Sequence, residues 1–115
     1  KTEKILGERI QINVLNGCGQ LGIADLYTNF LRANGYDVID FGNANNFNYN
    51  KTKIIIHNEN QKDHIKEIIN LLSIDNQEVE YNDDDNIFYS ATLIIGKNYN
   101  ILKSYNEVSK HYKPF

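Results

Sequence analysis

The sequence predicts an α/β fold: a two-layer α/β sandwich with the element order β-α-β-β-α-β-β, a mixed sheet and a short C-terminal helical extension. Two apolar patterns lead to this prediction. Short runs that alternate or are rich in β-branched residues are typical of strands, and apolar residues at intervals of three and four are typical of amphipathic helices. Because the two patterns take turns along the chain, we expect helices that pack on a sheet.

The first half of the chain contains a strand, a helix and a second strand. A strand is predicted at residues 9–15, where Ile10, Ile12 and Val14 alternate. The pair Asn34-Gly35 supplies a left-handed stop for the helix that follows, and the second strand is predicted at residues 36–41. This order indicates a parallel pair joined by a right-handed crossover. The helix is recognised by five apolar residues at helical spacing: Ile23, Leu26, Tyr27, Phe30 and Leu31.

The second half supplies three more strands, a helix and the extension. The unbroken run Ile54-Ile55-Ile56 lies in a strand predicted at residues 52–57, which we expect to be central and covered on both faces. A helix is predicted at residues 61–73 with Asn60 as its N-cap. A short strand at 78–81 and a last strand at 91–95 follow, and apolar spacing from about residue 100 to residue 115 predicts a further helix.

Composition limits the classes of function. With 115 residues the chain is long enough for one domain. The net charge of -3 and the absence of a basic stripe argue against nucleic acid as a partner. No apolar run reaches the roughly 18 residues of a membrane span, so this segment is not expected to cross a membrane. Because the first residue is Lys1 rather than Met, any export signal or anchor is expected outside this sequence.

Metal and catalytic sites are not predicted. Cys18 is the single cysteine, so neither an internal disulfide nor a zinc site built from thiolates is possible. The acidic run 83–85 lacks the glycine and the later ligands of an EF-hand loop and is interpreted as a solvated turn. The three histidines show neither metal-ligand spacing nor a catalytic order. We therefore expect no cofactor and a non-enzymatic role.

A glycine-rich loop connects the first strand to the first helix. Gly17, Gly19 and Gly22 form a G-x-G-x-x-G pattern, with Asp40 near the end of the second strand, as in dinucleotide-binding folds. A polar residue, Asn16, precedes the first glycine, however, and the second strand is followed by a loop and another strand. We favour a structural interpretation, in which Asn16-Gly17 is a turn needing positive φ, Gly19 avoids a clash and Gly22 allows close helix packing. Nucleotide or anion binding by the loop stays open as an alternative.

A second candidate region is the polar loop at residues 43–50. Asn43 and its neighbouring amides offer donors and acceptors, and Phe47 and Tyr49 offer aromatic faces that suit sugar rings or an apolar anchor of a protein partner. The alternative is that both rings pack into the core where the loop enters the third strand. The candidate ligand-binding residues are therefore Asn16, Gly17, Gly19, Asn43, Phe47 and Tyr49.

At these residues the chain resembles a known family, the C-terminal domain of LytR-CpsA-Psr cell-envelope proteins. The resemblance covers residues 8–98, which leaves residues 1–7 as a flexible lead-in and 99–115 as an extension. It departs from the family pattern at Cys18, where Thr or Ser is common. The matched residues are Val14, Leu15, Asn16, Gly17, Gly19, Gly22, Ala24, Gly35, Tyr36, Val38, Gly42, Asn43, Ala44, Tyr49, Thr52, Ile94, Ile95 and Gly96, of which Gly22, Ala24, Gly35, Thr52 and Gly96 are expected to be structural.

The resemblance implies a non-catalytic, extracytoplasmic accessory domain of the bacterial envelope. Its expected partners are a cell-wall polymer or an envelope protein. The transferase activity of such proteins belongs to a separate catalytic region that this sequence does not contain. Two alternatives stay open: a nucleotide- or anion-binding domain that uses the glycine loop, and a structural domain that forms a homodimer through the final sheet edge or the C-terminal extension.

Overall fold

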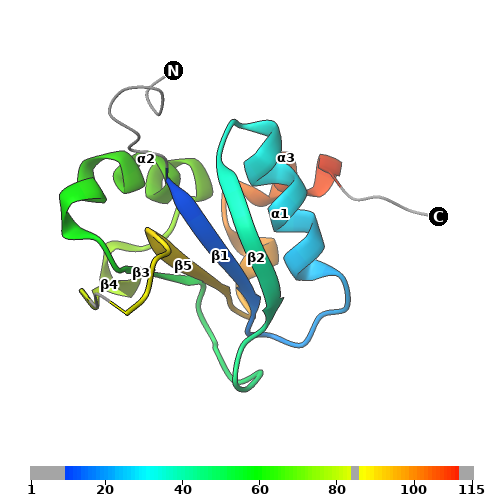
Figure 1. The fold of residues 1–115 in the computed structure, drawn as a ribbon. Helices are drawn as coiled ribbons and strands as arrows, with labels where there is room; N and C mark the ends of the chain where they lie inside the picture. Colours follow the sequence, from blue (N-terminus) through cyan, green and yellow to red (C-terminus); the bar gives the residue numbers. More distant parts are fainter. Residues whose placement is uncertain (1–9, 84–85, 112–115) are drawn as a thin grey trace.

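The computed structural model describes residues 10–83 and 86–111 and contains a five-stranded sheet with helices packed on it (Figure 1). The predicted α/β class and the order of strands and longer helices are confirmed. The strands are β1 (Gln11–Asn16), β2 (Asp37–Asn43), β3 (Lys53–Ile56), β4 (Val79–Tyr81) and β5 (Ala91–Ile95). The helices are α1 (Ile23–Ala33), α2 (Lys62–Leu72) and α3 (Tyr105–Val108), with 3-10 turns η2 (Glu59–Gln61), η3 (Asn76–Glu78), η4 (Tyr99–Ile101) and η5 (Ser109–His111).

The sheet is mixed, as predicted, and its strand order is β2-β1-β5-β3-β4. β1 is parallel to both β2 and β5, β3 is antiparallel to β5, and β4 is parallel to β3. The carboxyl ends of β1, β2 and β5 therefore meet at one end of the sheet. β5, the last strand in sequence, has neighbours on both sides, so the edge strands are β2 and β4.

The prediction that the third strand is central and covered on both faces is wrong. β5 lies in the middle of the sheet, and all five of its residues are buried. In β3, buried and half-buried residues alternate, and Ile55 is half-buried. The unbroken apolar run at residues 54–56 therefore lies in a strand with one buried face and one half-buried face.

One hydrophobic cluster joins the sheet to all three helices. Every second residue of β1 is buried, from Ile12 to Asn16. Helix α1 packs on β1 and β2, and α2 packs on β3. Figure 1 shows α1 beside β2 and α2 near the opposite side of the sheet, so each helix contributes its apolar stripe to the same core.

The helix ends show how local sequence sets the boundaries. Gly35, with φ of 90°, provides the left-handed residue predicted after α1. The predicted N-cap of the second helix is wrong: the Asn58 side chain accepts a hydrogen bond from the backbone N–H of Asn60 and so caps η2, the turn that precedes α2. Asn60 is therefore a donor in the cap rather than the cap itself.

The C-terminal extension is broken into short helical turns that pack on α1 and α2. Val108 is completely buried, and the buried Ser104 hydroxyl donates to the carbonyl of Leu72, the last residue of α2 (2.7 Å). The His111 ring contacts Phe30 edge-on, with 5.3 Å between the ring centroids. The extension thus closes the core beside α1, and the part of its predicted helix at residues 112–115 lies outside the described residues.

Candidate functional site

The Asn16 side chain organises the glycine loop. Asn16 ends β1, is 7% exposed and accepts hydrogen bonds through Oδ1 from the backbone N–H groups of Cys18 (3.0 Å) and Gly19 (2.8 Å). Its Nδ2 donates to the Gln20 carbonyl (2.9 Å). The N–H of Gly17 donates to Ile95 of β5 (2.9 Å). Three successive loop N–H groups are therefore bound within the protein, whereas a phosphate cradle needs such groups to point at its ligand.

The glycines of this loop have roles that differ from the predicted ones. Gly17 lacks a positive φ, and a Cβ there would lie 2.6 Å from Ile94 and 2.8 Å from Tyr49, so close packing requires the glycine. The left-handed residues are Gly19, at φ 86°, and Gly22, at φ 79°. A Cβ on Gly22 would meet nothing within 4 Å. Gly22 is thus needed for its backbone conformation at the start of α1 and not for close helix packing.

The loop at residues 43–52 is fastened to the glycine loop. The N–H of Ala44 donates to the Asn16 carbonyl (2.8 Å), and the N–H of Tyr49 donates to the Gly17 carbonyl (3.1 Å). Lys97, after β5, donates its N–H to the Tyr49 carbonyl (2.8 Å). Candidate residues from separate parts of the sequence therefore meet beyond the carboxyl ends of β1, β2 and β5.

Thr52 and Gly96 hold the far end of the 43–52 loop. The Thr52 hydroxyl accepts from the N–H of Gly96 (3.0 Å) and donates to Oδ1 of Asn98 (2.9 Å). The N–H of Thr52 donates to the same oxygen (2.8 Å). Both residues are buried, so their place in the family pattern has a structural explanation.

A shallow groove of about 450 Å³ lies between the glycine loop, the first turn of α1 and the end of β2. Four of the six predicted ligand-binding residues line it, namely Asn16, Gly19, Asn43 and Phe47, whereas Gly17 and Tyr49 do not. The remaining lining residues are Leu21, Gly22, Ala24, Asp25, Phe41 and Gly42. We call this feature the loop groove.

Apolar side chains are unusually exposed around the loop groove. Leu21 is 92% exposed, Phe41 45% and Phe47 43%. The Phe47 ring lies against Gly19, where a Cβ would be 3.4 Å from it. The alternative that both loop aromatics pack into the core is wrong for Phe47, and Tyr49 is half-buried over Gly17. Exposed aromatic rings beside amide groups can hold a ligand that has both an apolar face and polar edges.

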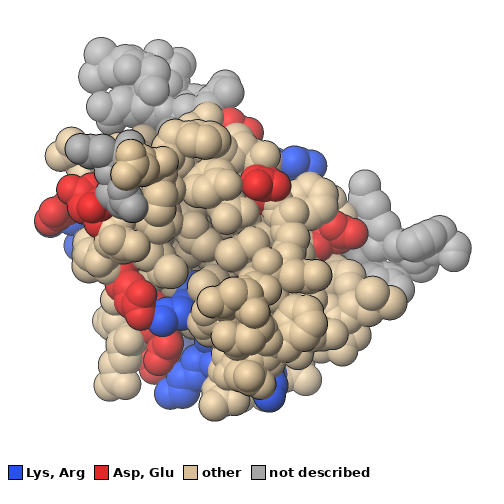
Figure 2. Space-filling model, turned by 60° about the horizontal axis from the view of Figure 1, so that its bottom comes forward, with Lys and Arg blue, Asp and Glu red and all other residues tan. Residues whose placement is uncertain are grey.

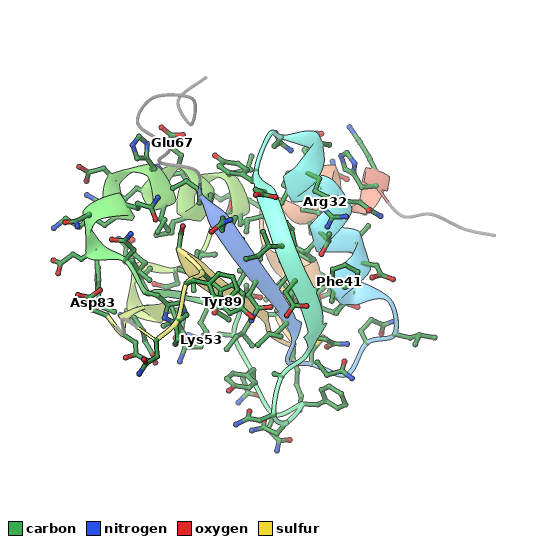
Figure 3. All side chains as sticks on the ribbon, in the orientation of Figure 1. Arg32, Phe41, Lys53, Glu67, Asp83 and Tyr89 are labelled. Atoms are coloured by element: carbon green, nitrogen blue, oxygen red, sulfur yellow. The ribbon has the colours of Figure 1, made fainter. Side chains whose placement is uncertain are left out.

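Sequence reasoning missed Leu21, Asp25 and Phe41 as groove residues. Phe41 belongs to the predicted second strand, but its exposure depends on β2 being an edge strand. Figure 3 shows Arg32 of α1 on the same side of the molecule, and its guanidinium carbon lies 5.9 Å from the centre of the Phe41 ring. The one available signal was Leu21, an apolar residue next to Gly22, which precedes α1.

The described ranges contain no cluster of three or more His, Cys, Asp or Glu residues suited to a metal ion. His57 is buried, with Nε2 2.8 Å from the Thr92 hydroxyl and Nδ1 3.2 Å from the Asn82 carbonyl. These contacts give it a structural role that links β3 to β5. Of the acidic turn predicted at 83–85, residues 84 and 85 lie outside the described residues.

The Cys18 thiol donates to Oδ1 of Asn16 (3.6 Å) and lies near a buried tyrosine. It is half-buried against the core, and Tyr27 is fully buried with no hydrogen-bond partner for its hydroxyl among the described residues. Burial raises the pKa of Tyr27 far above its ordinary value of 10.0, and Tyr105, Cys18 and Tyr99 add to this effect. Just above pH 10, the Tyr27 hydroxyl therefore stays neutral in the folded protein, whereas it ionises in the unfolded chain.

Replacing Tyr27 by phenylalanine should reduce the loss of stability at high pH. The folded-state pKa exceeds that of the unfolded chain, so the free energy of unfolding should fall as the pH rises above about 10. Near pH 7, Tyr27→Phe removes an unpaired buried hydroxyl and should be neutral or stabilising by about 1 kcal/mol. Urea denaturation of both proteins across this pH range measures both effects, and an unchanged pH profile would contradict the assignment.

The surface around the loop end of the sheet is mainly uncharged. Figure 2 shows acidic and basic side chains interspersed at its margins, with no continuous basic area on the face in view. Across the described residues, none of the helices is both long and apolar enough to span a bilayer.

The comparisons with known proteins identify the family. A family model described as LytR_C, LytR cell envelope-related transcriptional attenuator, matches residues 9–99, and the resemblance in the sequence predicted nearly the same range. Searches of curated proteins and of solved structures gave no significant match. Because the family model covers most of the chain, the protein belongs to the LytR_C family and is a cell-envelope-associated accessory domain.

Proposed function

We propose that the protein is a non-catalytic, extracytoplasmic binding module of the cell envelope, and that the loop groove receives a cell-wall glycopolymer. The observation that carries this proposal is the concentration of three exposed apolar side chains, Leu21, Phe41 and Phe47, around one groove that also contains amides. Sugar rings present apolar C–H faces and polar hydroxyl edges. Aromatic faces and Asn side chains are suited to these two features.

The loop groove is a less suitable site for a nucleotide or another anion. The N–H groups of Gly17, Cys18 and Gly19 are used within the protein. A carboxylate, Asp25, lines the groove in the first turn of α1, where it would repel a phosphate. These two observations favour the glycan over the alternative based on the glycine pattern.

Replacing Phe47 by alanine should weaken binding to purified cell-wall polymer about tenfold, which corresponds to about 1.4 kcal/mol. The ring is 43% exposed, so the change removes contact area for a ligand and little core packing. The matched control is Phe88→Ala, since Phe88 is 73% exposed and does not line the loop groove. Sedimentation with the polymer measures binding, and thermal unfolding of each variant checks that the fold is intact.

Two results would count against the proposal. Equal retention of the Phe47 and Phe88 variants would place binding elsewhere on the domain. If the polymer retains none of the unmodified protein, the glycan is the wrong partner and an envelope protein becomes the candidate to test by cross-linking.

A further inference from the structure

The loop groove contains an acidic group without a described partner. Asp25 is exposed, lines the groove and lies in the first turn of α1. It makes no ion pair or hydrogen bond with any residue in the described part of the chain. A carboxylate in the first helical turn interacts favourably with the positive end of the helix dipole, so this end of α1 already has its compensating negative charge.

The nearest described basic side chain is that of Arg32, whose guanidinium carbon lies 5.9 Å from the centre of the Phe41 ring. The described lining residues of the groove include neither lysine nor arginine. Arg32 is on the same helix but two turns farther along, about 10 Å in rise, and its guanidinium donates to the Val38 carbonyl (2.8 Å). Asp25 therefore gives the loop groove a negative end that is open to solvent.

The neighbours of Asp25 favour a cation that is attached to an apolar body. Phe47, Phe41 and Leu21 supply the exposed apolar surface of the same groove. An ammonium group forms charge-assisted hydrogen bonds with a carboxylate and is attracted by the face of an aromatic ring. A ligand with an ammonium group on a ring or chain would satisfy both features, whereas a neutral ligand would form no charge-assisted contact with Asp25.

The edge of β2 argues for a sugar rather than an extended peptide. A peptide that binds by strand addition needs free N–H and C=O groups along the edge. On β2, the Val38 carbonyl accepts from Arg32, and the Phe41 N–H donates to Oδ1 of Asp40 (2.9 Å). The register with β1 also shifts at this point. These features block regular pairing with another strand.

We propose that the ligand of the loop groove is an amino sugar with a free, protonated amine, which Asp25 binds while Phe47 contacts the sugar ring. This inference rests on the proposed function and specifies the class of sugar. It distinguishes a glycan with unmodified amines from the same glycan with acetylated amines, which has identical rings and no positive charge.

The test compares binding of a glucosamine tetramer and an N-acetylglucosamine tetramer by calorimetry at about pH 5.5, where sugar amines are protonated. We expect the free-amine tetramer to bind about tenfold tighter, as is reasonable for one charge-assisted contact. Asp25→Asn should reduce this ratio to about one. The matched control is Asp63→Asn, which removes an acid from the first turn of α2 and should leave the ratio unchanged.

The possible outcomes separate this inference from the proposed function. The inference is overturned if neither tetramer binds, if the ratio is near one in the unmodified protein, or if Asp63→Asn lowers it as much as Asp25→Asn. Equally tight, Asp25-dependent binding of tetralysine would assign the groove to a cationic peptide instead. In each case the polymer assay with Phe47→Ala still decides the proposed function independently. Unchanged affinity of the Phe47→Ala variant for the free-amine tetramer would contradict the assignment of both residues to one site.

Discussion

Replacing Gly96 by alanine should destabilise the domain by about 3 kcal/mol, at the upper end for an overpacked core position. Gly96 is buried directly after β5. A Cβ there would overlap the Lys51 carbonyl group and lie 2.6 Å from the backbone nitrogen of Thr52. Because backbone atoms cannot rotate away as a side chain can, the strand end or the 43–52 loop would have to move. The hydrogen bond from the Gly96 N–H to the Thr52 hydroxyl would be lost with this movement.

Guanidinium denaturation measures this change, with Gly42→Ala as the matched control. Gly42 lies in β2, lacks a positive φ, and has open space around an added Cβ. Alanine at that position should be neutral or stabilise the domain by about 0.5 kcal/mol, because it restricts the unfolded chain. Similar unfolding midpoints for the two variants would show that the close approach of Gly96 to Lys51 does not limit stability.

Replacing Asn16 by alanine should destabilise the domain by about 3 kcal/mol, because the change removes three hydrogen bonds and leaves backbone groups without partners. The groups affected are the N–H of Cys18, the N–H of Gly19 and the carbonyl of Gln20. Asn16 is 7% exposed, so water cannot readily replace these contacts. We also expect weaker binding at the loop groove, since Asn16 and Gly19 both line it.

Comparison of Asn16→Asp with Asn16→Ala tests the contribution of the Oδ1 acceptor of Asn16. The Asp variant retains the oxygen that accepts from Cys18 and Gly19 but places a second oxygen against the Gln20 carbonyl in a buried position, so we expect about 2 kcal/mol of destabilisation, less than for alanine. Asn50→Ala is the surface control, because Asn50 is exposed, and it should change the free energy of unfolding by less than about 0.5 kcal/mol. Urea denaturation compares all three. An Asp variant as unstable as the Ala variant would contradict the role of the shared acceptor.

Most of the fold could be predicted from local sequence patterns. The predicted last strand at residues 91–95 matches β5, and the first helix ends where Asn34-Gly35 predicts. These features depend on hydrophobic periodicity and on backbone preferences within a few residues of one another. The position of each strand in the sheet depends on distant partners instead, and for that reason β3 was wrongly predicted to be central.

The candidate site was predicted only in part. The two loops were recognised from Asn16, the glycines, Phe47 and their neighbours, but nothing local indicated that Asp25 would line the same groove. The predicted roles of Gly17 and Gly22 were also interchanged: Gly17 is needed for close packing, and Gly22 is needed for its positive φ. Gly17 is required by contacts with Ile94 and Tyr49, which are far away in sequence, and no turn pattern contains that information.

The sequence by itself determined the α/β class, the element order and the membership of the LytR_C family, because these follow from short-range patterns and from the spacing of turn residues. The tertiary structure decided that the glycine-loop N–H groups bind Asn16 and β5 rather than face a ligand. It also decided that Leu21, Asp25, Phe41 and Phe47 surround one groove. The physical reason is that β1 and β2 run parallel, so the loops at their carboxyl ends meet although some twenty residues separate them in the chain.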